Sequence, residues 1–147
     1  EIDNIDAQER LIGYENALRN AEIPIDPALI VKAYFTRTSG YREMKQLLDK
    51  DIDALFASSD LIGIGAINAI QEAGLRVPED IAVVGFDDFP VASQATPPLT
   101  TIRQPIVKKT ALATEILLDI LDGEVTGPKQ VILPTQLVIR QSCGYEM

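Results

Sequence analysis

Two adjacent carboxylates, Asp87 and Asp88, stand where a binding site is expected, directly after a short apolar run and a glycine. The run Ile81–Val84 is rich in β-branched side chains, which is typical of a strand buried on both faces within a parallel sheet. Open parallel sheets bind ligands just beyond the carboxyl ends of their strands. Asp87 and Asp88 are therefore candidate ligand contacts, although acidic residues in turns are more often solvated.

Polar and aromatic residues follow two other expected strands and would meet Asp87 at the same edge of the sheet. Phe35 ends one strand, and Ser58–Ser59–Asp60 follows another. An aromatic ring, small hydroxyls and carboxylates suit a polyhydroxylated ligand, whose hydroxyls donate to carboxylates and whose C–H face lies against a ring. Arg10 would add a charged donor. The alternatives are that Arg10 is a solvated helix charge and that Phe35 belongs to the core.

The composition argues against several classes of function. The 147 residues include 22 acidic and 13 basic side chains, a net charge of −9, which should repel phosphate backbones. There is no histidine, the commonest general base and metal ligand, and the single Cys143 excludes an internal disulfide. Gly63–Ile64–Gly65 lacks the third glycine of a phosphate-binding turn, and Lys108–Lys109 is interpreted as a solvated helix surface. We therefore expect no catalysis, no cofactor and no metal.

The elements that would position these residues alternate between helical and strand patterns. Asp6 opens a D-x-x-E capping sequence ahead of apolar residues at helical spacing, and Asp60 is the expected N-cap of a later helix. The predicted elements, in order, are a helix over 7–21, a strand over 29–35, a helix from Ser39, a strand over 53–57, a helix over 61–73 and a strand over 81–84. This alternation predicts an α/β fold with a parallel sheet flanked by helices.

Beyond Asp88 the pattern is less regular. Residues 89–98 are expected to form a loop, and the elements predicted after it are a strand over 99–103, a helix from Pro105 to Asp122, and strands over 131–133 and 136–139. No signal peptide or membrane span is evident, and the lone cysteine fits the cytoplasm. Because the chain begins without methionine, we expect a fragment that exposes an apolar sheet edge and associates.

Four stretches form a specific series in order and spacing. They are Ala57–Asp60 (ASSD), Ala66–Ile81 (AINAIQEAGLRVPEDI), Val84–Asp88 (VGFDD) and Pro98–Pro105 (PLTTIRQP). With Arg10–Tyr14 and Arg140–Ser142, they strongly resemble the ligand-binding core of lactose-repressor-type (LacI/GalR) transcriptional regulators. The resemblance covers nearly the whole chain.

The resemblance implies a periplasmic-binding-protein-like fold, of which this chain carries mostly the C-terminal lobe. It assigns residues 1–103 to an incomplete C-terminal lobe, 104–134 to a helix and strand of the N-terminal lobe, and 135–147 to a segment returning to the C-terminal lobe. The crossings at Arg103–Gln104 and Pro134 would form the hinge. The helix-turn-helix DNA-binding head and the opening strand and helix of the C-terminal lobe would lie outside this chain.

By the same resemblance, the effector contacts fall on Arg10, Phe35, Ser59, Asp87 and Gln104. Ser59 departs from the family pattern because asparagine is usual there, so hydroxyl recognition at that position loses an amide. The implied effector is a sugar or sugar derivative that closes the two lobes.

Closure of the lobes would change how the N-terminal lobes of a homodimer contact each other, and hence how its DNA-binding heads bind operator DNA. Ile64 and residues 89–95 are the implied dimer face, and the protein is expected to be cytoplasmic with no membrane partner. The alternative is the sugar-binding protein of an ABC transporter, which shares the fold.

Overall fold

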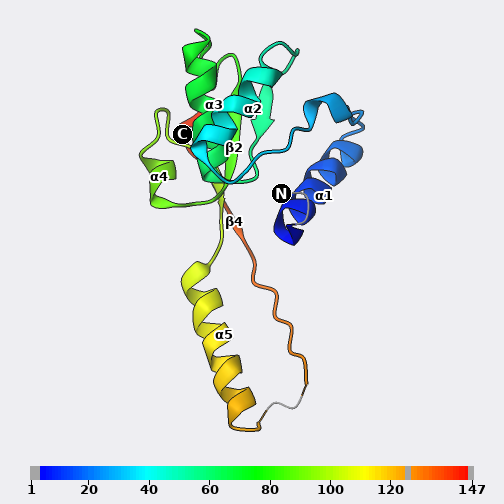
Figure 1. Ribbon diagram of the computed structural model, residues 1–147, viewed down its shortest axis with the longest axis vertical. Coiled ribbons are helices and arrows are strands. Elements are labelled where there is room, and N and C mark those ends of the chain that lie inside the picture. The colour runs from blue at the N-terminus through cyan, green and yellow to red at the C-terminus, as the bar shows by residue number, and fades with distance from the viewer. Residues whose placement is uncertain (1–3, 125–126, 146–147) are drawn as a thin grey trace.

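A four-stranded sheet forms the centre of the computed structural model, which describes residues 4–124 and 127–145 (Figure 1). The strands are β1 (Ala54–Phe56), β2 (Ala82–Asp87), β3 (Thr100–Arg103) and β4 (Gln136–Val138), in that spatial order. β1, β2 and β3 are mutually parallel, whereas β4 pairs antiparallel to β3. The predicted α/β fold with a largely parallel sheet is confirmed.

Helices precede and follow the strands in the predicted alternation. They are α1 (Ile5–Asn20), α2 (Arg37–Leu47), α3 (Asp60–Glu72), the short α4 (Pro90–Ser93) and α5 (Ile106–Leu121), with 3-10 turns η1 (Pro27–Leu29) and η2 (Gln141–Cys143). α4 lies inside the stretch that the sequence predicted to be a loop.

Two helix caps were predicted one or two residues too late. Asn4 rather than Asp6 caps α1, because its Oδ1 accepts the Ala7 N–H at 3.2 Å. Ser59 rather than Asp60 caps α3, accepting the Ile62 N–H at 3.3 Å. In both cases the acid lies in the first turn, where its charge favours the helix N-terminus without making the cap hydrogen bond.

The strands predicted over 29–35 and 131–133 are wrong. Residues 30–34 and 128–135 carry no strand assignment, and no strand in the described part of the chain pairs with either stretch. Alternating apolar residues favour an extended backbone, but a strand also needs a neighbour to receive its hydrogen bonds.

The core lies where α2 and α3 meet β2 and the start of β3. Its largest fully buried apolar side chains are Met44, Ile67, Ile70, Val83 and Leu99. α2 and α3 approach at backbone distance, because a Cβ on Gly65 would lie 2.1 Å from the Arg37 carbonyl oxygen. By contrast, α1 and α5 contain no buried residue, and α5 extends away from the sheet (Figure 1).

Candidate functional site

Asp87 is the meeting point of the predicted binding residues. It ends β2, and its Oδ1 accepts a hydrogen bond from Gln104 Nε2 at 2.7 Å and an ion pair from Arg10 Nη2 at 3.4 Å. The Arg10 and Asp87 side chains are only 12% and 13% exposed. The structure thus brings together residues from α1, from the end of β2 and from the segment after β3, with Arg10 and Asp87 lying 77 positions apart.

Arg10 is held in place by aromatic rings and a backbone carbonyl. Its guanidinium lies 4.0 Å from the centroid of the Phe86 ring and 5.9 Å from that of Phe35, and its Nη1 donates to the Ser58 carbonyl oxygen. The alternative interpretation of Arg10 as a solvated helix charge is therefore wrong. Phe86 was missed as a site residue, although it is an aromatic at the carboxyl end of a strand, the signal that identified Phe35.

Ser59 has a different place from the other four predicted residues. It is 2% exposed, and its hydroxyl is engaged as the N-cap of α3. Its neighbour Ser58 reaches Arg10 through the main chain instead. A direct ligand contact by Ser59 stays a prediction.

Burial sets the electrostatics of Asp87. It raises the pKa of the Asp87 carboxyl above its usual range, and the hydrogen bond from Gln104 and the charge of Arg10 offset this only in part. The Asp87 carboxylate has two protein hydrogen-bond donors, Arg10 and Gln104, to offset its loss of water, so additional hydrogen bonds would stabilise its charge. Ligand hydroxyls would supply them.

Asp88 is not a solvated loop acid, the usual case for an acid in a turn. Its side chain is 8% exposed, and it accepts hydrogen bonds from Arg103 Nε and Arg140 Nη2, each at 2.6 Å. Burial disfavours its charge, but the two arginines outweigh burial and lower the pKa of Asp88. Sequence alone could not show this, because Arg140 lies 52 positions away.

Asp60 supports the turn that carries both acids. It is fully buried, accepts the Phe89 N–H at 2.7 Å and is hydrogen-bonded to the Thr101 hydroxyl. Burial raises the pKa of Asp60. Gly85 lies against it, since a Cβ there would be 2.6 Å from Asp60 Oδ1.

Lys109 also differs from its interpretation as a purely solvated charge. Its Nζ lies 3.1 Å from Gln104 Oε1, although the residue is exposed. Gln104 is therefore held by Asp87 through its amide nitrogen and by Lys109 through its oxygen.

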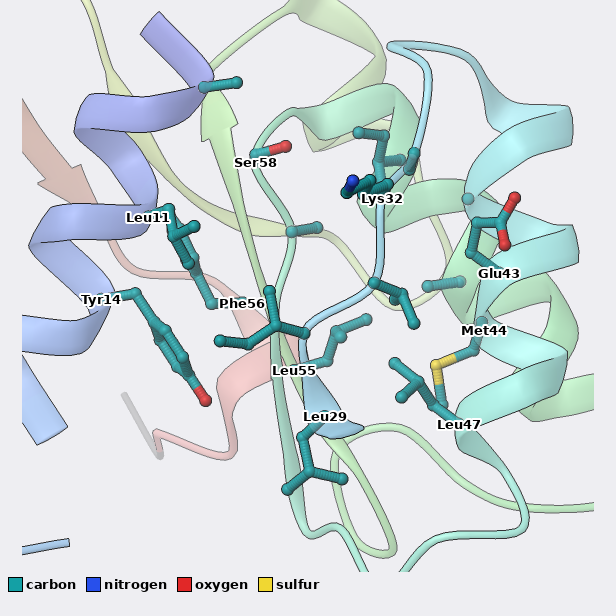
Figure 2. A pocket seen from close by; sticks show the side chains of 18 of the residues that line it. Leu11, Tyr14, Leu29, Lys32, Glu43, Met44, Leu47, Leu55, Phe56 and Ser58 are labelled. Carbon is teal, nitrogen blue, oxygen red and sulfur yellow. The ribbon is translucent and has the colours of Figure 1, made fainter. Parts of the chain in front are cut away.

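An apolar groove of about 360 Å³ lies beside this cluster (Figure 2). Side chains of α1, of the extended stretch before α2, of β1 and of α2 surround it, and the Tyr14 ring stacks on Phe56 with centroids 6.4 Å apart. β1 pairs only with β2 among the described strands, so its other edge borders the groove. Ser58 lines the groove, but none of the five predicted site residues is among its described lining.

Several other features limit the possible functions. Over residues 4–124 and 127–145, no group of three or more His, Cys, Asp and Glu side chains could hold a metal ion. No helix in this described part has the length and apolar character needed to cross a membrane. Ile64 is 6% exposed within the core, so it cannot line a dimer surface as the resemblance implied.

The fold and this cluster define a class of protein. A family model for the periplasmic binding protein-like domain matches residues 3–143. The chain therefore belongs to the family of periplasmic-binding-protein-like domains.

Within that family, the similarity is to transcriptional regulators, which confirms the resemblance to the LacI/GalR type. The HTH-type transcriptional regulator CelR of Thermobifida fusca is 42% identical over 142 residues, which are 95% of this chain and 42% of that protein. The solved CelR–cellobiose complex superposes with a TM-score of 0.89 at 43% identity, covering 91% of this chain and 42% of that one.

A LacI family regulator from Enterococcus faecium with bound ribose superposes with a TM-score of 0.84 at 30% identity, covering 90% of this chain and 50% of that one. The chain thus spans about half or less of the length of these relatives. It corresponds to part of their effector-binding region.

Proposed function

We propose that this chain is the C-terminal part of the effector-binding region of a LacI-type transcriptional regulator and that a sugar or sugar derivative is its effector. The observation that carries the proposal is the convergence of Arg10 and Gln104 on the largely buried Asp87 carboxylate. This cluster lies at the carboxyl end of a strand in a parallel sheet, where such folds bind ligands. The relatives that hold cellobiose and ribose support a sugar ligand.

Each residue of the cluster has a role that follows from its chemistry. Asp87 accepts hydrogen bonds from ligand hydroxyls, and Arg10 donates to ligand oxygens from its position above Phe86. Phe35 offers a ring face to the C–H face of a sugar. Gln104, on the crossing toward α5, contributes an amide.

The whole protein would use this site to control DNA binding. We assign residues 1–103 to the C-terminal lobe, 104–134 to the N-terminal lobe and 135–147 to the return segment; residues 1–3, 125–126 and 146–147 lie outside the described part. The effector must bind the closed arrangement of the lobes more tightly than the open one, since only differential affinity shifts the equilibrium.

In this proposal a cytoplasmic homodimer passes the change to helix-turn-helix heads outside this chain. The chain itself has no catalytic role, in keeping with the absence of histidine and with relatives that are regulators. The transporter alternative has no support from the relatives, which are named as transcriptional regulators. A secretion signal ahead of this segment in the full-length protein would revive it.

The test is a thermal-shift screen of the full-length protein with monosaccharides, disaccharides and nucleosides. At least one sugar should raise the melting temperature in a concentration-dependent way, because a ligand that binds only the native state stabilises it. The same sugar should change the affinity for operator DNA. A panel without any shift, or turnover of a glycoside or nucleotide, would contradict the proposal.

A further inference from the structure

Two chain segments join the sheet to α5, and Asp88 lies between an arginine at the end of β3 and an arginine that follows β4. The first leaves β3 at Arg103, and the second returns to β4, which pairs with β3 so that Arg103 faces Gln136 (Figure 1). Asp88 accepts hydrogen bonds from Arg103, the last residue of β3, and from Arg140, which follows β4, each at 2.6 Å. One buried carboxylate therefore links the end of β3 to the chain beyond β4.

The two arms of this arrangement differ in burial. Arg140 is 17% exposed; its Nη1 donates to the Leu99 carbonyl oxygen at 2.7 Å, and its main-chain N–H donates to Thr100 Oγ1 at 2.8 Å. Arg103 is 50% exposed, and its Nε donates to Asp88 Oδ2. Arg140 thus anchors Asp88 from the more buried side, and Arg103 is the more exposed of its two partners.

The two residues at the end of β2 and the two at the end of β3 bind each other in a crossed pattern, although the main-chain ladder pairs Asp87 with Arg103. Asp87 and Asp88 have φ values of 114° and 59°, a left-handed geometry in which neighbouring side chains diverge. Asp87 binds Gln104 at 2.7 Å, while Asp88 binds Arg103 at 2.6 Å. A change in the crossing at 103–104 must therefore alter both contacts together.

We propose that Asp88 is a positioning residue for the effector site: anchored by Arg140, it holds Arg103 and so fixes the neighbouring Gln104 against Asp87. The inference rests on the proposed function, in which Asp87 and Gln104 contact the effector. Holding Gln104 in place before binding removes the entropic cost of ordering it when the ligand arrives. Without Asp88, Gln104 keeps only its contacts with Asp87 and Lys109 and moves away from the site more readily.

The variant that isolates this role is Asp88→Asn in the full-length protein. Asparagine has the same size and tolerates a positive φ, so the substitution removes the charge with little backbone strain. The matched control is Asp80→Asn, which removes one negative charge from an exposed pair with Arg76, 3.0 Å apart and remote from the site. Asp88→Asn should weaken binding of the sugar identified by the thermal-shift screen about threefold to tenfold, and Asp80→Asn less than about twofold.

A double-mutant cycle separates positioning from general destabilisation. Gln104→Ala should weaken sugar binding strongly in the wild-type protein but much less in the Asp88→Asn protein, where Gln104 is already displaced. Effects that add to within about twofold, as expected of independent sites, would overturn the proposal. An unchanged affinity in Asp88→Asn alone would do the same.

Hydrogen exchange on the ligand-free full-length protein gives a readout that needs no effector. Asp88→Asn should speed exchange of the Gln104 and Ile106 amides, whereas Asp80→Asn should not. Equal exchange in the wild type and Asp88→Asn would overturn the proposal whether or not a sugar binds. If exchange changes but Asp87→Asn leaves sugar affinity intact, the proposed effector site is wrong and the crossing function of Asp88 stands.

A folding failure of Asp88→Asn would not block the test. Arg103→Gln removes only the exposed arm and leaves the Asp88–Arg140 anchor in place. It should reproduce both the faster exchange and the smaller effect of Gln104→Ala. Failure to do so would overturn the proposal.

Discussion

Replacing Asp60 with alanine should destabilise the protein by about 2–4 kcal/mol, since leaving a buried donor or acceptor without a partner costs about 1–3 kcal/mol. Asp60 is 0% exposed and accepts the Phe89 N–H at 2.7 Å, while its other oxygen is hydrogen-bonded to the Thr101 hydroxyl. Alanine removes both contacts and also leaves a small cavity beside Gly85. The loss should therefore exceed that of an ordinary surface substitution.

Asp60→Asn should behave differently, because it separates hydrogen bonding from charge. Its carbonyl oxygen can accept the Phe89 N–H and its amide can donate to Thr101 Oγ1, so both contacts survive. Burial raises the pKa of Asp60 above its ordinary value of 3.8, so proton binding to this carboxyl is more favourable in the folded state than in the unfolded state. The stability linked to that proton is fully present below the unfolded pKa and is lost as the pH rises through the folded pKa.

Urea unfolding of wild type, Asp60→Asn and Asp60→Ala at acidic and neutral pH gives the free energy of unfolding of each protein at each pH. Asp60→Asn should be as stable as the wild type or more so at neutral pH, and its advantage should shrink on acidification. Asp60→Ala should be the least stable at both. A loss below about 0.5 kcal/mol for Asp60→Ala, the range of neutral surface changes, would refute the reasoning. Equal losses for the two variants would also refute it.

Two further outcomes follow from packing and from the unpaired sheet edge. In thermal denaturation, Gly65→Ala should lower the free energy of unfolding by about 1–3 kcal/mol, because its Cβ would lie 2.1 Å from the Arg37 carbonyl oxygen. Gly13→Ala, with nothing within 4 Å of its Cβ, should raise it by up to about 1 kcal/mol. The opposite order would contradict the contact between α2 and α3. The 147-residue chain should associate through the β1 edge and the apolar groove beside it, so its mass in light scattering should rise with concentration. Val31→Lys, which places a charge in that groove, should reduce the association. A constant monomer mass at all concentrations would contradict the prediction.

The parts of the fold that sequence predicts well are those whose signals are local. The apolar run Ile81–Val84 predicts β2, and apolar residues at helical spacing predict α3, because burial of a stripe or a short run needs no knowledge of the partner. The same logic placed Asp87 at a strand end. Arg10, Phe35 and Gln104 came from the family resemblance or from shared strand edges, and the structure brings all three to Asp87 or Arg10.

The parts that sequence could not predict depend on long-range partners. Residues 29–35 have a strand pattern, but the structure provides no adjacent strand within the described chain. Asp88 follows a strand in a loop, where acids are usually solvated, yet it is paired with Arg140, which lies 52 positions away in the sequence. The caps at Asn4 and Ser59 were missed because several adjacent polar residues can cap a helix. The capping residue is the last one with an extended backbone before the helix, and the sequence does not show which residue that is.

The central claim is that Asp87 binds the effector, and calorimetric titration of the full-length protein tests it most directly. The sugar found by the thermal-shift screen is titrated into wild type, Asp87→Asn and the matched Asp80→Asn protein. Asp87→Asn should bind it roughly 10- to 150-fold more weakly, which corresponds to about 1.5–3 kcal/mol for hydrogen bonds to a charged group, and Asp80→Asn should bind as the wild type does. Equal affinity in all three proteins would contradict the account.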